Sequence, residues 1–154
     1  MTDYYDVNLK KSRHNILLKN KNFEASIGML EDHEKVQSCV DKFKPDVIIH
    51  LAAQAGVRYS IFNPKVYFDT NVNGFYNIIE IAKSYRIKHL LFASSSSVYG
   101  DQEKYPINEN FNTDKPLSFY AGTKKANEAL AFAFSKIYNL PTTCLRLFTV
   151  YGPY

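Results

Sequence analysis

The sequence predicts an α/β fold with a doubly wound parallel sheet, and two observations carry that prediction. Short apolar runs of strand length alternate along the chain with longer stretches of helical periodicity. Strands that alternate with helices indicate parallel pairing, because each parallel connection needs a crossover. The run at residues 46–53 is apolar at successive positions, which is typical of a strand covered by helices on both faces.

The expected elements follow in chain order. Strands are expected at residues 22–27, 46–53, 89–93 and 142–147. Helices are expected at residues 31–43, 66–85 and 118–138, where apolar residues recur at helical spacing. Their inner faces are expected to include Val40, Phe43, Phe75, Ile79, Ala129 and Ile137. Right-handed crossovers bring the carboxyl ends of parallel strands to one edge of the sheet, so ligands are expected at that edge.

Composition limits the class of protein. A chain of 154 residues with 45% hydrophobic and 22% charged residues is most simply one globular domain. The net charge of +4 is spread along the chain, so a solvated surface is a better interpretation than nucleic-acid binding. No run of about 18 apolar residues occurs, so no membrane span is expected. Cys39 and Cys144 lack metal-ligand spacing and indicate reduced thiols in a cytoplasmic chain without a metal site.

A tyrosine and a lysine four residues apart, Tyr120 and Lys124, are predicted to share one face of the last helix. An ammonium beside a phenol favours the phenolate, so Tyr120 could act as a base near neutral pH. This spacing alone is also typical of a solvated helix face. A run of four serines, residues 94–97, directly follows the apolar strand at 89–93, and a serine hydroxyl can relay a proton. The two features together favour a proton-transfer site.

Six stretches of the chain match the motifs of one enzyme family in that family's order. They are residues 3–11, 50–60, 71–75, 92–100, 120–128 and 146–153. On these stretches the chain resembles the extended short-chain dehydrogenase/reductase enzymes that act on nucleotide sugars, and most of all the UDP-glucuronate 4-epimerases. The resemblance implies a Rossmann-like fold, NAD as cofactor, a UDP-sugar substrate and a homodimer. It also implies oxidation at sugar C4 followed by re-reduction of the 4-keto sugar on its other face, which leaves NAD unchanged.

The resemblance assigns roles to individual residues. Tyr120 would be the general base for the sugar 4-hydroxyl, Ser95 would bridge that hydroxyl and Tyr120, and Lys124 would lower the Tyr120 pKa and bind the nicotinamide ribose. The other residues implied to contact the cofactor are Leu30, Leu51, Ala52, Ala53, Gln54 and Asn71. The other residues implied to contact the substrate are Arg58, Ser96, Ser97 and Thr149.

Three of these assignments have structural alternatives. Asn71 could instead be a buried asparagine that bridges two backbone segments. Thr149 could provide a hydroxyl to a turn at a strand end. For Arg58 a position at the surface or a strand edge is the preferred interpretation over anion binding.

The chain departs from the family pattern in two places. None of its six glycines falls in a G-x-x-G-x-x-G or G-x-G-x-x-G phosphate loop. We therefore expect residues 1–154 to be an internal fragment, a partial NAD-binding domain without the first βαβ glycine-rich segment and without the C-terminal substrate part. Such a chain is expected to bind NAD weakly and to be inactive alone. In addition, Met29 stands before Leu30 where the family has an aspartate, and a thioether cannot replace a carboxylate as acceptor for the adenine amino group.

The serine run also discriminates between reactions. Elimination of water needs an acid and a base beside the sugar, and residues 95–97 provide no carboxylate. Epimerisation therefore fits better than the dehydration or decarboxylation carried out by other members of the family. A non-catalytic remnant that associates with a partner through unpaired strand edges is the remaining alternative.

Overall fold

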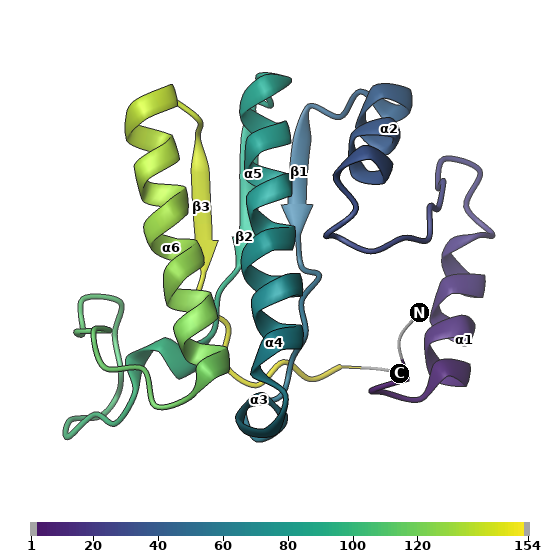
Figure 1. Ribbon diagram of the computed structural model, residues 1–154. Helices are drawn as coiled ribbons and strands as arrows, with labels where there is room; N and C mark the ends of the chain where they lie inside the picture. The colour runs from purple at the N-terminus through teal and green to yellow at the C-terminus, as the bar shows by residue number, and fades with distance from the viewer. Residues whose placement is uncertain (1–2, 153–154) are drawn as a thin grey trace.

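The computed structural model describes residues 3–152, in which a parallel sheet has the strand order β1-β2-β3. Its strands are β1 (Val47–His50), β2 (His89–Ala93) and β3 (Thr142–Leu145). In the register, Ile49 of β1 pairs with Leu91 of β2, which pairs with Thr143 of β3. Strands and helices alternate, and α5 and α6 lie side by side across the sheet (Figure 1). The predicted parallel α/β fold is confirmed.

The helices begin and end where capping residues allow. They are α1 (Val7–Leu17), α2 (His33–Phe43), α3 (Tyr59–Phe62), α4 (Pro64–Tyr67), η1 (Phe68–Asn73), α5 (Gly74–Ser84), η2 (Ser96–Tyr99) and α6 (Phe119–Tyr138). The Asp32 carboxylate accepts a hydrogen bond of 3.0 Å from the Lys35 amide and starts α2. Ser118 caps α6 through a 3.0 Å bond from Ala121, and α6 ends at Asn139 in the left-handed conformation, with φ of 54°.

The single helix expected at residues 66–85 is divided into three consecutive segments. Between α4 and α5 lies η1, a π-helix in which each turn is wider than in an α-helix. Asn71 lies in this wide turn and is buried, with its side chain bonded to backbone groups of the loop after β1. Apolar periodicity predicted the two flanking segments but contained no signal for the π turn.

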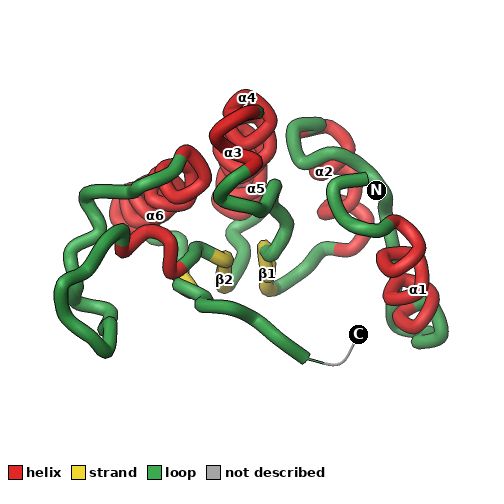
Figure 2. The backbone as a smooth tube through the Cα atoms, turned by 90° about the horizontal axis from the view of Figure 1, so that it is seen from below, coloured by secondary structure: helices red, strands yellow, loops and turns green. Residues whose placement is uncertain are grey.

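Helices of the described chain cover one face of the sheet, as Figure 2 shows for β1 and β2. On that face Leu90 and Phe92 are 0% and 1% exposed and belong to the core around α5. On the opposite face Val47 and Ile49 are 45% and 63% exposed. We expected helices to cover residues 46–53 on both faces of the sheet. Within residues 3–152 no helix packs on the second face, so this expectation is not met there.

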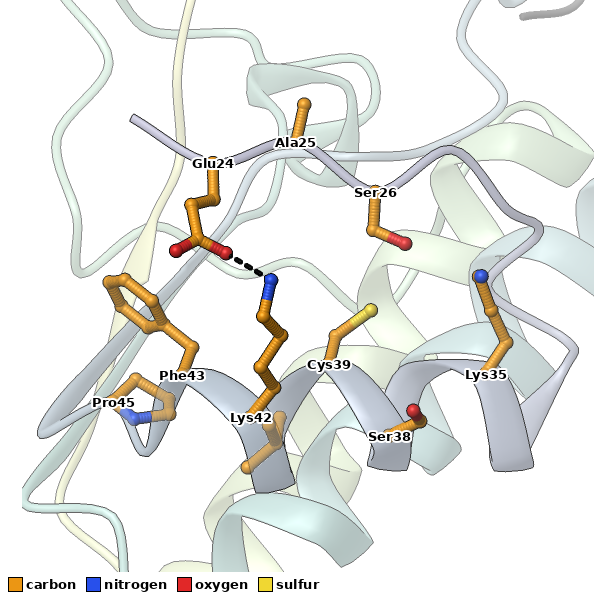
Figure 3. A pocket seen from close by; sticks show the side chains of 10 residues that line it. Glu24, Ala25, Ser26, Lys35, Ser38, Cys39, Lys42, Phe43 and Pro45 are labelled. Carbon is orange, nitrogen blue, oxygen red and sulfur yellow. Dashed lines mark hydrogen bonds and ion pairs between the residues drawn. The ribbon is translucent and has the colours of Figure 1, made fainter. Parts of the chain in front are cut away.

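The strand expected at residues 22–27 is absent. Residues 24–26 run instead alongside α2, where Glu24 lies 2.6 Å from Lys42 (Figure 3). A strand exists only through hydrogen bonds to a neighbouring strand, and the one strand paired with β1 among the described residues is β2. The segment is therefore extended but unpaired. β1 and β3 are also shorter than expected, ending at His50 and Leu145.

The core lies between the sheet and the helices α5 and α6. Its buried members are Phe75, Ile78, Ile79, Ala82, Ile87, Leu90, Phe92, Ala131 and Leu140. The expected inner face of the helix at 66–85 is confirmed at Phe75 and Ile79, whereas Phe43 of α2 and Ile137 of α6 are 66% and 67% exposed.

The buried face of α6 differs from the apolar stripe that the sequence predicted. Its buried residues are Ala121, Thr123, Lys124, Asn127 and Ala131, whereas Ala129 is exposed. Lys124 and Thr123 are buried because their polar atoms bond to groups at the sheet edge and to the helix backbone. The buried face of α6 therefore combines polar and small apolar residues.

Candidate active site

Tyr120 and Lys124 lie one turn apart on α6, at the carboxyl end of the sheet. Lys124 is 2% exposed, and its ammonium donates a hydrogen bond of 2.8 Å to the carbonyl oxygen of Ala93, the last residue of β2. The ammonium nitrogen lies 6.0 Å from the centroid of the Tyr120 ring. The predicted pairing of a phenol and an ammonium on one helix is thus present, with the ammonium fixed to the strand end.

The serine run forms the turn that follows β2. Ser95 caps η2: its hydroxyl oxygen accepts a 3.2 Å hydrogen bond from the Ser97 amide and lies 3.1 Å from the Ser97 hydroxyl. Ser95 is 9% exposed, and Ser96 and Ser97 are half-buried. The turn therefore presents a buried hydroxyl on the side of Tyr120, close enough to lower the pKa of the phenol.

Burial is the largest influence on both ionisable groups. It raises the pKa of the Tyr120 phenol, and the nearby Ser95 hydroxyl offsets part of that rise. It lowers the pKa of Lys124 to about 8. The lowering of the Tyr120 pKa that the sequence led us to expect from Lys124 is not found in the chain alone. The ammonium is directed at the Ala93 carbonyl oxygen rather than at the phenol oxygen.

Asn71 connects the loop after β1 to α6. Its side-chain oxygen accepts a 2.8 Å hydrogen bond from the Gln54 amide, and its side-chain nitrogen donates to the Gln54 carbonyl at 3.0 Å. The same nitrogen lies 3.1 Å from the Thr123 hydroxyl, which donates in turn to the Tyr120 carbonyl at 2.7 Å. With 1% exposure, Asn71 has the geometry of the bridging alternative, and it supports the site through backbone positions.

Two residues of this region were not identified from the sequence. Ser60 is fully buried; its hydroxyl donates to the Val57 carbonyl at 2.6 Å and accepts a 3.2 Å bond from the Tyr120 amide. The Tyr67 hydroxyl lies 2.7 and 2.6 Å from the carbonyl oxygens of Ala55 and Gly56. Both side chains hold residues 55–60 against the first turn of α6. A serine and a tyrosine near a helix start are too common to have indicated this.

The remaining predicted site residues have varied surroundings. Leu51 and Ala52 are exposed at the end of β1, Ala53 is half-buried, and Gln54 is buried. Leu30 packs closely on the start of α5. A Cβ added at Gly74 would lie 2.6 Å from the Cβ of Leu30. The other two, Arg58 before α3 and Thr149 after β3, are exposed. The contacts of all these residues with cofactor or substrate stay predictions. Pro153, the last residue of the matching stretches, lies outside the described residues.

One carboxylate lies beside the serine run. Glu128 of α6 accepts two hydrogen bonds from Arg146, at 3.0 and 2.9 Å, and one from the Ser94 hydroxyl at 2.6 Å. Although burial acts to raise it, the bonds from Arg146 and Ser94 hold the pKa of Glu128 below its usual value. The group is therefore an ion-paired anion and not a proton donor.

Other features of the structure do not compete with this site. In the part of the chain that is described, no group of His, Cys, Asp and Glu could hold a metal ion. No described helix has the length and apolar character needed to span a membrane. A cavity of about 440 Å³ lies between residues 24–26 and α2, but its lining contains none of the predicted site residues (Figure 3).

Comparison with known proteins gives a consistent result. A family model described as GDP-mannose 4,6 dehydratase matches residues 3–154. A probable UDP-glucuronate 4-epimerase of Rhizobium meliloti is 50% identical over all of this chain and 45% of its own length. UDP-glucuronate 4-epimerase 6 of Arabidopsis thaliana is 45% identical over 99% of this chain and 33% of its own length. The chain therefore spans less than half the length of these curated relatives.

Solved structures of similar fold include epimerases and a dehydratase of Streptomyces venezuelae. The UDP-glucose 4-epimerase of Thermotoga maritima, determined with UDP-glucose, has a TM-score of 0.82 and 31% identity over 87% of this chain and 44% of that chain. The UDP-glucose 4-epimerase of Brucella ovis, determined in complex with NAD, has a TM-score of 0.77 and 28% identity over 80% of this chain and 38% of that chain.

Proposed function

The chain belongs to the family described as GDP-mannose 4,6 dehydratase, and from that membership we propose that the protein is an NAD-dependent nucleotide-sugar 4-epimerase that interconverts UDP-glucuronate and UDP-galacturonate. The observation that carries the proposal is the site itself. Ser95, Tyr120 and Lys124 gather at the carboxyl end of β2, without a carboxylate free to drive elimination. The 50% identity to a probable UDP-glucuronate 4-epimerase supports the choice of sugar.

The residues present fit one end of a dinucleotide. Lys124 has three N–H donors, and within residues 3–152 one of them is used, by the Ala93 carbonyl. The two others are available to the hydroxyls of a ribose. Leu51 and Ala52 are exposed at the same sheet edge, where ligands of parallel sheets bind. The assignment of residues 1–154 to one partial NAD-binding domain stays a prediction, as does weak binding of NAD by these residues alone.

The chemistry assigned to the chain is proton transfer at the sugar 4-hydroxyl. When bound, NAD would supply the hydride acceptor and donor for sugar C4. Tyr120 takes the proton of the 4-hydroxyl, and Ser95 holds that hydroxyl and relays the proton. Lys124 contributes positive charge and positions its partners, and the buried surroundings strengthen each of these interactions. The pKa of Tyr120 is raised in the chain alone. To act as a base, Tyr120 therefore needs its phenolate form to be stabilised when cofactor and substrate are bound.

Dehydration is the second candidate, because the matching family model is described as a dehydratase. That reaction needs an acid and a base at neighbouring sugar carbons. Residues 95–97 are all serine, and the carboxylate beside them, Glu128, is paired with Arg146. The site therefore supports oxidation and re-reduction at one carbon better than elimination.

We also propose that the protein acts as a homodimer in the cytoplasm. The ring centroids of Tyr76 on α5 and Phe134 on α6 lie 6.4 Å apart, and those of Phe134 and Tyr138 lie 5.1 Å apart. Tyr76 and Tyr138 are 47% and 49% exposed, so this ring cluster is available to a second copy. The chain's two cysteines are both free thiols, which supports a reducing compartment.

The test is a product assay of the whole protein that carries this chain. Incubated with UDP-glucuronate and NAD, it should form UDP-galacturonate without net NADH, as followed by NMR and absorbance. Tyr120→Phe should lower kcat by roughly 10²–10⁴-fold, because it removes the base and keeps the ring. Ser95→Ala should cost less, since water can take over the relay.

A matched control is Tyr105→Phe, the same change at a tyrosine that is 74% exposed, which should keep full turnover. Undiminished turnover in Tyr120→Phe would exclude the mechanism. Release of CO₂ and a UDP-pentose would identify a decarboxylase. A 4-keto-6-deoxy product from a nucleotide hexose would identify a dehydratase.

A further inference from the structure

The Glu128 carboxylate lies at the junction of four segments. It projects from α6 and accepts the two-point hydrogen bond of Arg146, which follows β3. Its Oε1 atom also accepts the Ser94 hydroxyl at 2.6 Å and lies 3.4 Å from the Cys144 sulfur. Arg146 donates further to the Glu109 carbonyl at 3.1 Å. Glu128 and its partner Arg146 thus connect α6, the end of β2, β3 and the loop that contains residue 109.

The position of Glu128 along α6 relates this junction to the site. It follows Lys124 by four residues and Tyr120 by eight, so the three side chains lie on one face of the helix. Lys124 holds the carbonyl of Ala93, and Glu128 holds the hydroxyl of the next residue, Ser94. Two successive turns of α6 therefore fix two successive residues of the chain that leads into Ser95.

This contact takes no direct part in the proposed proton transfer. Glu128 is an ion-paired anion with 10% side-chain exposure, and Ser94 is 4% exposed. Arg146 directs its guanidinium at Glu128 and Glu109, and its central carbon lies 5.0 Å from the Tyr99 ring centroid. Three of the five guanidinium N–H donors bond within the protein, so the pair is first of all an internal contact. The Glu128–Ser94 contact can still affect the serine turn, because Ser94 leads into it.

We propose that Glu128 is a positioning residue that sets the place of the Ser95 hydroxyl relative to Tyr120, by holding Ser94 against α6. The inference rests on the proposed function as far as turnover is concerned. The Ser94 hydroxyl transmits the effect, since Ser94 and Ser95 are adjacent and Ser95 starts η2. A displacement of about 1 Å in such a hydroxyl can cost up to 10²-fold in rate.

Removal of Glu128 itself is a poor test, because it leaves the Arg146 guanidinium without its partner and disturbs the fold. Ser94→Ala removes the link and keeps the ion pair. Ser135→Ala is the matched control, since it makes the same change further along α6, away from the serine turn. In the whole protein, Ser94→Ala should lower kcat about 10-fold with little change in KM, whereas Ser135→Ala should leave kcat unchanged.

A double-mutant cycle separates positioning from a general structural role. If Ser94 acts through Ser95, then Ser94→Ala should have no further effect on kcat in a Ser95→Ala background. Equal losses in both backgrounds would overturn the proposal, as would an unchanged kcat in the single variant. Failure of the parent protein to epimerise UDP-glucuronate would instead count against the proposed function.

A second readout does not depend on activity. Ser95 acts to lower the Tyr120 pKa, so displacement of its hydroxyl should raise that pKa further. The other titratable groups near the phenol are Lys124 on α6, Tyr67 on α4 and Tyr5. NMR titration of ¹³C-labelled tyrosine, assigned with Tyr120→Phe, should show the rise in Ser94→Ala and not in Ser135→Ala. An identical Tyr120 titration in parent and Ser94→Ala would contradict the proposal.

Discussion

The part of the molecule around α6 and the part that precedes β1 are held by different kinds of interaction. Around α6, apolar side chains such as Phe75 are fully buried, and buried polar groups such as Asn71 are bonded on each side. Before β1, α1 has no buried residue and α2 has one, Val40. The difference indicates that the site obtains most of its rigidity from residues 47–147, to which the N-terminal part adds contacts such as that of Leu30 with the start of α5.

The largest effect is expected from a large-to-small change in the core. Phe75→Ala should lower the free energy of unfolding by about 3–5 kcal/mol, because the lost ring leaves a cavity between α5 and the sheet. Ile16→Ala on α1, where the side chain is 46% exposed, should cost less than about 0.5 kcal/mol. Urea unfolding of both variants gives the two values. Similar losses would show that the two parts are equally well packed.

The same contrast explains what could be predicted from the sequence. The strand at residues 89–93 and the helix at 118–138 were predicted within one residue, since a short apolar run and a long periodic stretch are strong local signals. The strand at residues 22–27 was predicted wrongly, because alternation of side chains says nothing about the presence of a pairing strand. The N-terminal part is thus also where sequence reasoning was least reliable.

The site shows the same limit at the level of single residues. Tyr120, Lys124 and Ser95 could be identified because their residue types and spacing carry chemical meaning. Ser60 and the contacts of Glu128 could not, because each depends on segments far apart in the chain. The inner face of α6 was predicted from apolar residues alone, whereas Thr123, Lys124 and Asn127 are among its buried residues.

A second prediction concerns the buried asparagine. Asn71→Ala should lower the free energy of unfolding by about 1–3 kcal/mol for each backbone group of Gln54 left buried without a partner. Asn73→Ala is the matched control, since Asn73 lies on the same π-helix and is exposed. Urea unfolding of both variants measures the difference. An equal, small loss in both would show that the loop after β1 does not depend on the asparagine.

The buried lysine gives a dependence on pH. Its pKa falls from the usual 10.5 to about 8 in the folded chain. Between these values the unfolded chain keeps the proton of Lys124 and the folded chain releases it, so the free energy of unfolding rises with pH. Below about pH 8 both states are protonated and the cost of burying the charge is fully present.

The expected contribution of Lys124 is an increase of about 2 kcal/mol in the free energy of unfolding from pH 8 to pH 10. Other lysines and tyrosines titrate in the same range, so the quantity to measure is the difference from Lys124→Met. That variant should lack the increase in urea unfolding at the two pH values. Parallel pH dependences in parent and variant would mean that the ammonium is well solvated.

The smallest effect is expected at the contact that holds residues 24–26 to α2. Lys42 and Glu24 lie 2.6 Å apart, but their side chains are 75% and 62% exposed, so water and salt screen the attraction. Lys42→Met should therefore leave the urea midpoint unchanged within error, at low salt and at high salt alike. Lys35→Met, which changes another lysine beside the same segment, is the matched control. A loss in Lys42→Met that approached the loss in Phe75→Ala would contradict the comparison, since it would show that this segment is anchored as firmly as the core.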